Sequence, residues 1–180
     1  MDKPLVTICM PLHNYEQYCV ETIRSIQMQT LTNYEVYIIN DRSTDNSEEV
    51  ALEAIKDDKR FHLFNVDFGN LSATRNYGLA KGSAPFCVCI DSDDRMGRED
   101  FLEILVTALE QDTDIGIAYT GITVMDADGN LGHLNPWPKE YHVEGMINRQ
   151  NQIPSLCCFR RIAWERQGGY SRYFTHAEDA

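Results

Sequence analysis

Leu5-Val6-Thr7-Ile8-Cys9-Met10 is a short and nearly all-apolar run, and Pro11-Leu12-His13-Asn14 follows it directly. Apolar runs without alternation are typical of parallel strands that are buried on both faces of a sheet. The same pattern recurs at Val36 to Ile39, Phe61 to Val66, Phe86 to Ile90 and Ile115 to Tyr119. The sequence therefore predicts a central, mostly parallel sheet.

Helical patterns lie between these runs. Apolar side chains recur at helical spacing over residues 17–29 and over residues 101–109. Asp45 with Glu48 predicts a capping box for a second helix, and Ser72 is the predicted cap of a third. Strands that alternate with helices predict an α/β fold in which helices flank the sheet.

The pattern changes in the last third of the chain. Ile122 to Met125, followed by Asp-Ala-Asp-Gly at residues 126–129, predicts a β-hairpin. We expect residues 135–155 to be irregular and a last helix to run from Arg160 to Gln167. This part is expected to form a small irregular and β region beside the sheet.

Length and composition suit one folded domain. The chain has 180 residues, 43% of them hydrophobic and 24% charged, which suffices to bury one core. We therefore treat residues 1–180 as a single domain, with halves at 1–120 and 121–180.

The 28 Asp and Glu residues exceed the 16 Lys and Arg residues, which gives a net charge of −12. This charge argues against nucleic acid as a partner, and an anionic ligand would need a cation, basic side chains or helix N-termini.

The sequence shows no membrane-spanning pattern, because no stretch approaches roughly 18 consecutive apolar residues. Its first four residues, Met1-Asp2-Lys3-Pro4, lack the pattern of a signal peptide. We expect a cytoplasmic protein, and peripheral association with the inner face of the membrane stays open. The six cysteines fit this location: no C-x-x-C motif occurs, so we expect buried thiols rather than disulfides or zinc ligands.

Polar side chains gather directly after three of the predicted strands. Pro11, His13 and Asn14 follow the first strand, Asp41 ends the second, and Asp91-Ser92-Asp93-Asp94 follows the fourth. Weaker sets follow the third and fifth strands. In open α/β sheets, ligands bind outside the carboxyl ends of the strands. We therefore expect the three polar groups to line one crevice.

The segment Asp91-Ser92-Asp93-Asp94 places three carboxylates within four residues, and these repel one another unless a cation lies between them. Mg²⁺ and Mn²⁺ suit such oxygen-rich sites, because they keep waters and take substrate phosphates as their remaining ligands. A solvated acidic turn that caps the next helix is the structural alternative. The position directly after an apolar strand favours the metal site.

Three further residues carry alternatives that the sequence leaves open. Asp41 either accepts a hydrogen bond from a nucleobase or has a purely structural role. Arg75 stands near a helix N-terminus, against the helix dipole, so it either meets an anionic or carbonyl-bearing ligand or forms a surface ion pair. Asp179, beside Glu178, is either a general base or part of a solvated acidic terminus.

Taken together, these motifs resemble those of family 2 glycosyltransferases, which have the Rossmann-like GT-A fold. The resemblance runs from residue 5 to residue 179, and the order and spacing of the motifs are specific. The matching pieces are Val6 to Asn14, Glu35 to Asp45, Gly69 to Gly82, Ile90 to Asp94, Gly168-Gly169-Tyr170 and Glu178-Asp179.

The resemblance implies that a sugar moves, with inversion, from a nucleoside-diphosphate sugar such as a UDP-sugar to the hydroxyl of a glycan or lipid-linked acceptor. Residues 1–120 would be the nucleotide-sugar half and residues 121–180 the start of the acceptor half. Mn²⁺ or Mg²⁺ would be held by Asp93 and Asp94, with Asp93 favoured, and Asp179 would be the catalytic base. The implied donor-binding residues are Pro11, His13, Asn14, Asp41, Arg75, Asp91 and Ser92.

Several features depart from the family pattern. His13 stands where a tyrosine is commoner, so stacking on the base is in question. Asn40 and Arg42 replace the more usual Asp and Gly of their turn, and arginine is costly at a positive φ. The chain stops one residue after Asp179, so we expect it to be a piece of a longer protein.

A nucleotide-sugar-binding module without turnover is the main alternative, because the acceptor half would be incomplete. An oxidoreductase of Rossmann type is disfavoured, since the first strand is not followed by G-x-G-x-x-G. A nucleotidyltransferase would carry a Gly-rich, Arg-bearing loop there, which the sequence also lacks.

Overall fold

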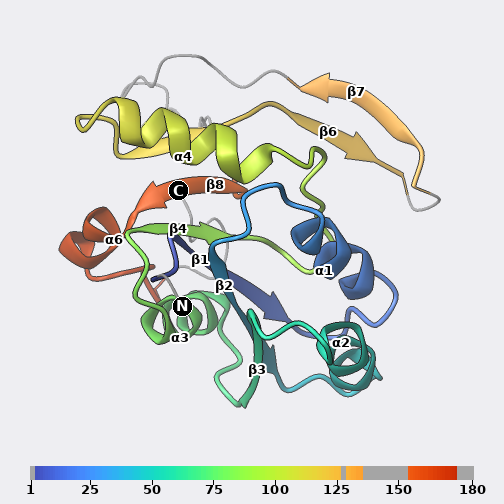
Figure 1. Ribbon diagram of the computed structural model, residues 1–180. Coiled ribbons are helices and arrows are strands. Elements are labelled where there is room, and N and C mark those ends of the chain that lie inside the picture. The colour runs from blue at the N-terminus through green and yellow to red at the C-terminus, as the bar shows by residue number, and fades with distance from the viewer. Residues whose placement is uncertain (1–2, 127–128, 136–153, 174–180) are drawn as a thin grey trace.

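The computed structural model describes residues 3–126, 129–135 and 154–173. Within them, one sheet has the strand order β3-β2-β1-β4-β8-β5, and β6 pairs with β7 (Figure 1). The α/β fold with a mostly parallel sheet is confirmed. The strands are β1 Val6–Leu12, β2 Tyr34–Asp41, β3 Phe61–Val66, β4 Phe86–Cys89, β5 Ile117–Tyr119, β6 Ile122–Met125, β7 Leu131–Asn135 and β8 Cys157–Arg160.

Strand β8 was not predicted from the sequence. It lies between β4 and β5 and is antiparallel to both, whereas β1 pairs in parallel with β2 and β4, and β2 with β3. Its apolar run covers only residues 156–159, which is too short for periodicity to separate a strand from the start of a helix. The last helix therefore begins one residue later than expected, at Arg161.

Helices cover both faces of the sheet (Figure 1). Because side chains alternate along a strand, Val6, Ile8 and Met10 of β1 pack with α1, α2 and α4, whereas Cys9 packs with α3 and α6. None of the described helices combines the length and the apolarity that crossing a bilayer requires. The helices are α1 Cys19–Gln27, α2 Ser47–Ile55, α3 Leu71–Lys81, α4 Phe101–Gln111 and α6 Arg161–Gln167.

The predicted cap of α3 is wrong, and the capping box predicted for α2 is only half formed. The cap of α3 is Asn70, whose Oδ1 accepts a hydrogen bond from a backbone N–H of the first turn at 2.9 Å, while Ser72 lies inside that turn. Asp45 accepts from the first N–H of α2 at 3.0 Å, but Glu48 accepts from Asn65 of β3 and forms no capping box. In each case a neighbouring Asn stands at the cap, a choice that local sequence leaves open because Ser, Asp and Asn cap almost equally well.

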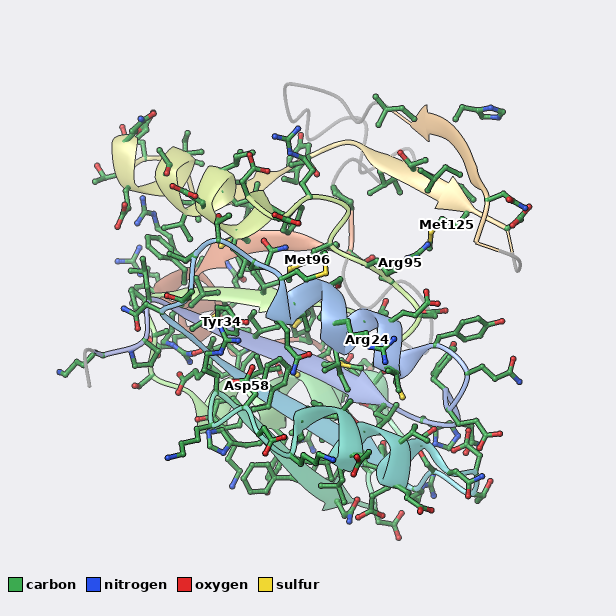
Figure 2. All side chains as sticks on the ribbon, turned by 45° about the vertical axis from the view of Figure 1, so that its right-hand side comes forward. Arg24, Tyr34, Asp58, Arg95, Met96 and Met125 are labelled. Atoms are coloured by element: carbon green, nitrogen blue, oxygen red, sulfur yellow. The ribbon has the colours of Figure 1, made fainter. Side chains whose placement is uncertain are left out.

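The predicted β-hairpin is present as β6 and β7, and Arg95 ties it to the rest of the domain. The Arg95 guanidinium contacts Met125 Sδ at the end of β6, and Figure 2 shows the two side chains pointing toward one another. The same guanidinium pairs with Glu21 of α1 at 2.9 Å. The loop that follows β4 is thereby linked to both the hairpin and α1.

All six cysteines lie among the described residues, are buried and form no disulfide, so the prediction of buried thiols is confirmed. Cys9 and Cys89 are partners in the register of β1 and β4, on the face that α3 covers. Their small side chains allow α3 to lie close to the sheet.

Gly78 also permits this close approach, and its replacement should be costly. A Cβ at this position would overlap Cys9 Sγ and lie 3.0 Å from Ile39 Cγ1. We expect Gly78→Ala to lower the free energy of unfolding by about 1–3 kcal/mol, because overpacking outweighs the roughly 1 kcal/mol by which alanine favours a helix. Urea denaturation measures the change. Gly97→Ala is the matched control, since its Cβ would meet no atom within 4 Å, and equal stability of the two variants would contradict the tight packing of α3.

Candidate functional site

A cavity of about 660 Å³ opens at the carboxyl ends of β1, β2 and β4. It brings together seven of the residues expected from the sequence, so the predicted convergence of the three polar groups is confirmed. Arg75 and Asp94 lie beside the cavity and do not line it. The lining residues are Pro11, Leu12, His13, Asn14, Tyr15, Asp41, Arg42, Gly69, Asn70, Leu71, Thr74, Asp91, Ser92 and Asp93.

The loop between β3 and α3 is built around the carboxylate of Asp41. Oδ1 accepts hydrogen bonds from the backbone N–H groups of Phe68 and Gly69 at 2.9 and 3.1 Å. Oδ2 accepts from the N–H of Asn70 at 3.3 Å and from the hydroxyl of Thr74 at 3.0 Å. These four bonds use the roughly four acceptor sites that a carboxylate offers. The Asp41 side chain therefore organises this wall of the cavity.

The hydrogen bonds also keep Asp41 ionised. Burial acts to raise the pKa of its carboxyl, but the hydrogen bonds from Gly69, Phe68 and Thr74 outweigh burial and hold the pKa below its ordinary value. A fixed negative charge thus lies at the end of β2. Its partners are mostly backbone groups, which cannot move away without unfolding the loop.

His13 and Asn14 join the loop after β1 to the end of β2. His13 Nδ1 donates to the carbonyl oxygen of Asp41 at 2.6 Å, which places the ring proton on that nitrogen because a carbonyl only accepts. Asn14 adopts a left-handed backbone with φ of 58°, and its Oδ1 accepts from the N–H of Thr44 at 2.7 Å. Both side chains therefore shape the rim of the cavity.

Arg75 is buried, with an exposed fraction of 3%, and its Nη2 pairs with Asp91 Oδ1 at 2.8 Å. Although burial acts against the charged guanidinium, the Asp91 carboxylate holds the pKa of Arg75 above its ordinary value. The ion pair of Arg75 is therefore internal, and it does not lie at the surface as one interpretation of the sequence held. This pair fixes the first residue of the acidic loop after β4.

Other bonds hold the rest of that loop. The Ser92 hydroxyl, which is buried, donates to the carbonyl oxygen of Pro11, and the Thr22 hydroxyl of α1 lies 2.9 Å from Ser92 O and 2.7 Å from Asp94 O. The backbone of residues 91–94 is therefore tied to both β1 and α1. Ser92 acts here through its hydrogen bond to the first strand.

Within the described residues, no ion pair with Lys or Arg involves Asp93 or Asp94. Burial, followed by the charges of Asp91 and Asp93, raises the pKa of Asp94 to about 6. Asp93 is exposed in the cavity and raises the pKa of the neighbouring Tyr15. Such a concentration of carboxylate oxygens is what a divalent cation would relieve.

The donor set suits Mg²⁺ or Mn²⁺ only in part. Among residues 3–126, 129–135 and 154–173, no three His, Cys, Asp or Glu side chains converge as for an ion enclosed by protein. One or two carboxylates, with water and phosphate oxygens completing the shell, form a common arrangement for Mg²⁺. Asp93 and Asp94 fit that arrangement, and a metal here would depend on a phosphate-bearing ligand.

The sequence missed the part of the wall that follows β3. Gly69, Asn70, Leu71 and Thr74 line the cavity, although this segment seemed a weak candidate from its composition. Asp41 was the residue from which this wall could have been predicted, since an ionised group at the end of a buried strand needs several hydrogen-bond donors nearby. Backbone N–H groups supply most of them and have no sequence pattern of their own.

The motif Gly168-Gly169-Tyr170 packs beside Arg75 through Asn76 of α3. Asn76 Oδ1 accepts from the backbone N–H of Tyr170 at 2.8 Å and from Trp164 Nε1 at 3.0 Å, and its Nδ2 donates to Tyr170 O at 2.8 Å. The Tyr170 ring lies 5.6 Å from Arg75 Cζ. The expected base Asp179 lies outside the described residues.

Asp41→Asn tests the anchoring role of this carboxylate. We expect the unfolding free energy at pH 7 to fall by about 2–3 kcal/mol, because an amide NH₂ cannot accept the bonds that one carboxylate oxygen receives. Because the folded-state pKa of Asp41 lies below its ordinary value, the stabilisation is fully present above about pH 4 and is lost as the pH falls through that lower pKa. The difference between wild type and variant should therefore begin to shrink below about pH 4 and vanish at more acidic pH. Urea denaturation at several pH values measures both effects. Asp67→Asn, at a side chain that is 81% exposed, is the control. A difference that persists unchanged into acid would contradict the role.

Known proteins resemble this chain in sequence and in fold. The chain matches the family described as "Glycosyl transferase family 2" over residues 7–166. It is 31% identical over 154 residues to EpsH of Bacillus subtilis (strain 168), which covers 82% of this chain and 44% of EpsH. It is 25% identical over 182 residues to chondroitin synthase of Escherichia coli, which covers 98% of this chain and 25% of that protein. The chain thus spans less than half the length of these relatives.

Solved structures share the fold. TarS of S. aureus, residues 1–349, superposes with a TM-score of 0.76 at 19% identity, covering 97% of this chain and 52% of that one. The mannosyltransferase PcManGT of Pyrobaculum calidifontis, solved with GDP-Man and Mn²⁺, gives a TM-score of 0.71 at 18% identity, covering 94% and 48%. These similarities establish the GT-A fold. With the family match across most of its length, the chain belongs to glycosyl transferase family 2.

Proposed function

We propose that the protein to which this chain belongs transfers a sugar from a nucleoside-diphosphate sugar, with UDP as the favoured nucleotide, to an acceptor hydroxyl. The observation that carries the proposal is the cavity that joins the acidic loop after β4 to the ordered loops after β1 and β2. Family membership supports it. TarS has been solved with UDP-GlcNAc, which supports a UDP-sugar as the donor.

Asp93 and Asp94 would hold the Mn²⁺ or Mg²⁺ that the fold family implies. When bound, such an ion supplies positive charge that stabilises the departing diphosphate. Arg75 keeps Asp91 in place and adds a buried positive charge beside the acidic loop. The net charge of −12 is then compatible with an anionic donor, because the local charges differ from the overall one.

The nucleoside would lie between the loops after β1 and β2. His13 and Asn14 form one wall, and the segment anchored by Asp41 forms the other. Since the Asp41 carboxylate already accepts four hydrogen bonds, we propose that it serves the base chiefly by shaping this wall. Pro11 and Ser92 complete the floor of the cavity, where the Ser92 hydroxyl donates a hydrogen bond to the carbonyl oxygen of Pro11.

Asp179 is the proposed general base. It would take the proton of the acceptor hydroxyl while the oxygen forms a bond to the anomeric carbon, and the bond from that carbon to the diphosphate oxygen breaks with both electrons. Displacement at one face inverts the anomeric configuration without a covalent sugar–enzyme intermediate. The acceptor is proposed to be a glycan or a lipid-linked sugar, and a cytoplasmic protein at the inner face of the membrane would suit the latter.

A binding module without turnover is the alternative function, because this chain spans less than half of its relatives. Isothermal titration with UDP and Mn²⁺, combined with an assay of UDP-sugar hydrolysis, separates the two. Binding with hydrolysis supports the transferase, and binding alone supports the module. Failure of every nucleoside diphosphate to bind with Mn²⁺ would overturn both.

Asp93→Asn tests the proposed metal site. We expect the variant to lose at least tenfold in affinity for UDP in the presence of Mn²⁺, because a carboxylate bonded to the ion contributes more than about 1.4 kcal/mol. Calorimetric titration measures the affinity, and circular dichroism shows that the fold is kept.

Asp57→Asn is the matched control, because Asp57 is an exposed aspartate in the turn after α2, away from the cavity. It removes one negative charge without touching the site. If Asp93→Asn and Asp57→Asn bound UDP equally well, the metal would have to lie elsewhere.

A further inference from the structure

Arg42 stands at the mouth of the cavity in a conformation that arginine rarely adopts. It directly follows Asp41 at the end of β2, and its φ is 60°, in the left-handed region that favours glycine. Strained residues of this kind cluster at ligand sites, because the strain persists only where the surrounding structure enforces it.

The guanidinium of Arg42 rests against the backbone of Gly69. A Cβ on Gly69 would overlap Arg42 Nη2 and lie 2.9 Å from Cζ, so only glycine leaves room for this arrangement. Gly69 is itself left-handed, with φ of 58°, and its N–H is bound by Asp41. Two unusual backbone conformations on adjacent loops thus bring one guanidinium against Gly69 at the cavity mouth.

Only one edge of this guanidinium is engaged by the protein. Nε lies 3.2 Å from Asp67 Oδ1 and 3.7 Å from Asp41 Oδ1. Within the described part of the chain, no protein atom accepts a hydrogen bond from Nη1 or Nη2 of Arg42, and the closest ion-pair contacts are those of Nε. The side chain is 53% exposed, so four N–H donors remain for a ligand.

Arg42 is also the only Lys or Arg among the described residues that line the cavity. Arg75 is buried and paired with Asp91, on the side of β4. In the strand order, β1 separates β2 from β4, so the two ends lie roughly 10 Å apart at the usual strand spacing. A diphosphate held beside Asp93 would place the nucleoside toward β2.

We propose that Arg42 recognises the nucleobase of the donor, by donating its Nη N–H groups to a carbonyl oxygen of uracil or guanine. The proposal rests on the function proposed above and adds the residue that selects the base. A planar fork of donors matches carbonyl acceptors and opposes the amino group that adenine presents. The phosphates are the less suitable target, because they are expected near Asp93 at the other end of the cavity.

The test is calorimetric titration of wild type, Arg42→Gly and Arg42→Lys with UDP, ADP and inorganic pyrophosphate, each with Mn²⁺. Arg42→Gly should bind UDP about tenfold more weakly or worse, while its affinity for ADP and for pyrophosphate changes less than about twofold. Arg42→Lys should not restore UDP binding, because it keeps the charge and loses the planar fork. Arg98→Ala, which removes an exposed arginine paired with Asp100, is the control for lost charge.

The outcomes are distinct. An equal loss for UDP, ADP and pyrophosphate, or rescue by lysine, would make Arg42 a general contact to negative charge and overturn base recognition. Unchanged UDP binding would overturn any role in the site. If wild type itself bound no nucleotide, the proposed function would fail before Arg42 was tested. Unfolding does not confound the variant, since glycine relieves the strain at φ of 60° and the midpoint of thermal unfolding should rise or stay the same.

Discussion

The binding of three consecutive backbone N–H groups by the carboxylate of Asp41 is the interaction on which the cavity depends. It links the end of β2 to the loop before α3, two segments that are 27 to 29 residues apart in the sequence. The dependence is mutual, because a buried carboxylate stays ionised only while these donors surround it. The same loop carries Gly69, whose lack of a side chain admits the guanidinium of Arg42. One hydrogen-bonded cluster thus sets both the wall of the cavity and the charge at its mouth.

Different functional groups lie at the two ends of this cavity, because they follow different strands of the sheet. At the end of β4, Asp91 pairs with Arg75, and burial, followed by the charges of Asp91 and Asp93, raises the pKa of Asp94 to about 6. At the end of β2, the charged groups are instead satisfied by backbone donors and by Arg42. A ligand that carries phosphates at one end and a base with hydrogen-bonding edges at the other matches this division. The placement of charged groups around the cavity therefore describes this site better than the net charge of −12 does.

The sequence predicted those parts of the fold and site that local pattern determines. Apolar runs identified β1 to β5, and the position of Asp91 to Asp94 after one run placed the acidic loop. Strand β8 was missed because its pairing with β4 and β5 is a tertiary contact, not a local pattern. The role of Asp41 in organising a distant loop was hidden for the same reason, since its partners are backbone groups. The sequence suggested a turn that avoids a positive φ at Arg42, since such a φ is costly for arginine, but Arg42 has φ of 60°, and its contact with Gly69 required the structure.

A crystal structure of the chain with UDP and Mn²⁺ tests the assignment of the cavity most directly. The diphosphate and the ion should lie beside Asp93, and the uracil should lie between the loop of His13 and the segment at Gly69, with a carbonyl oxygen within hydrogen-bond distance of Arg42. A nucleotide bound outside the cavity, or one whose base lies at the β4 end, would contradict the assignment.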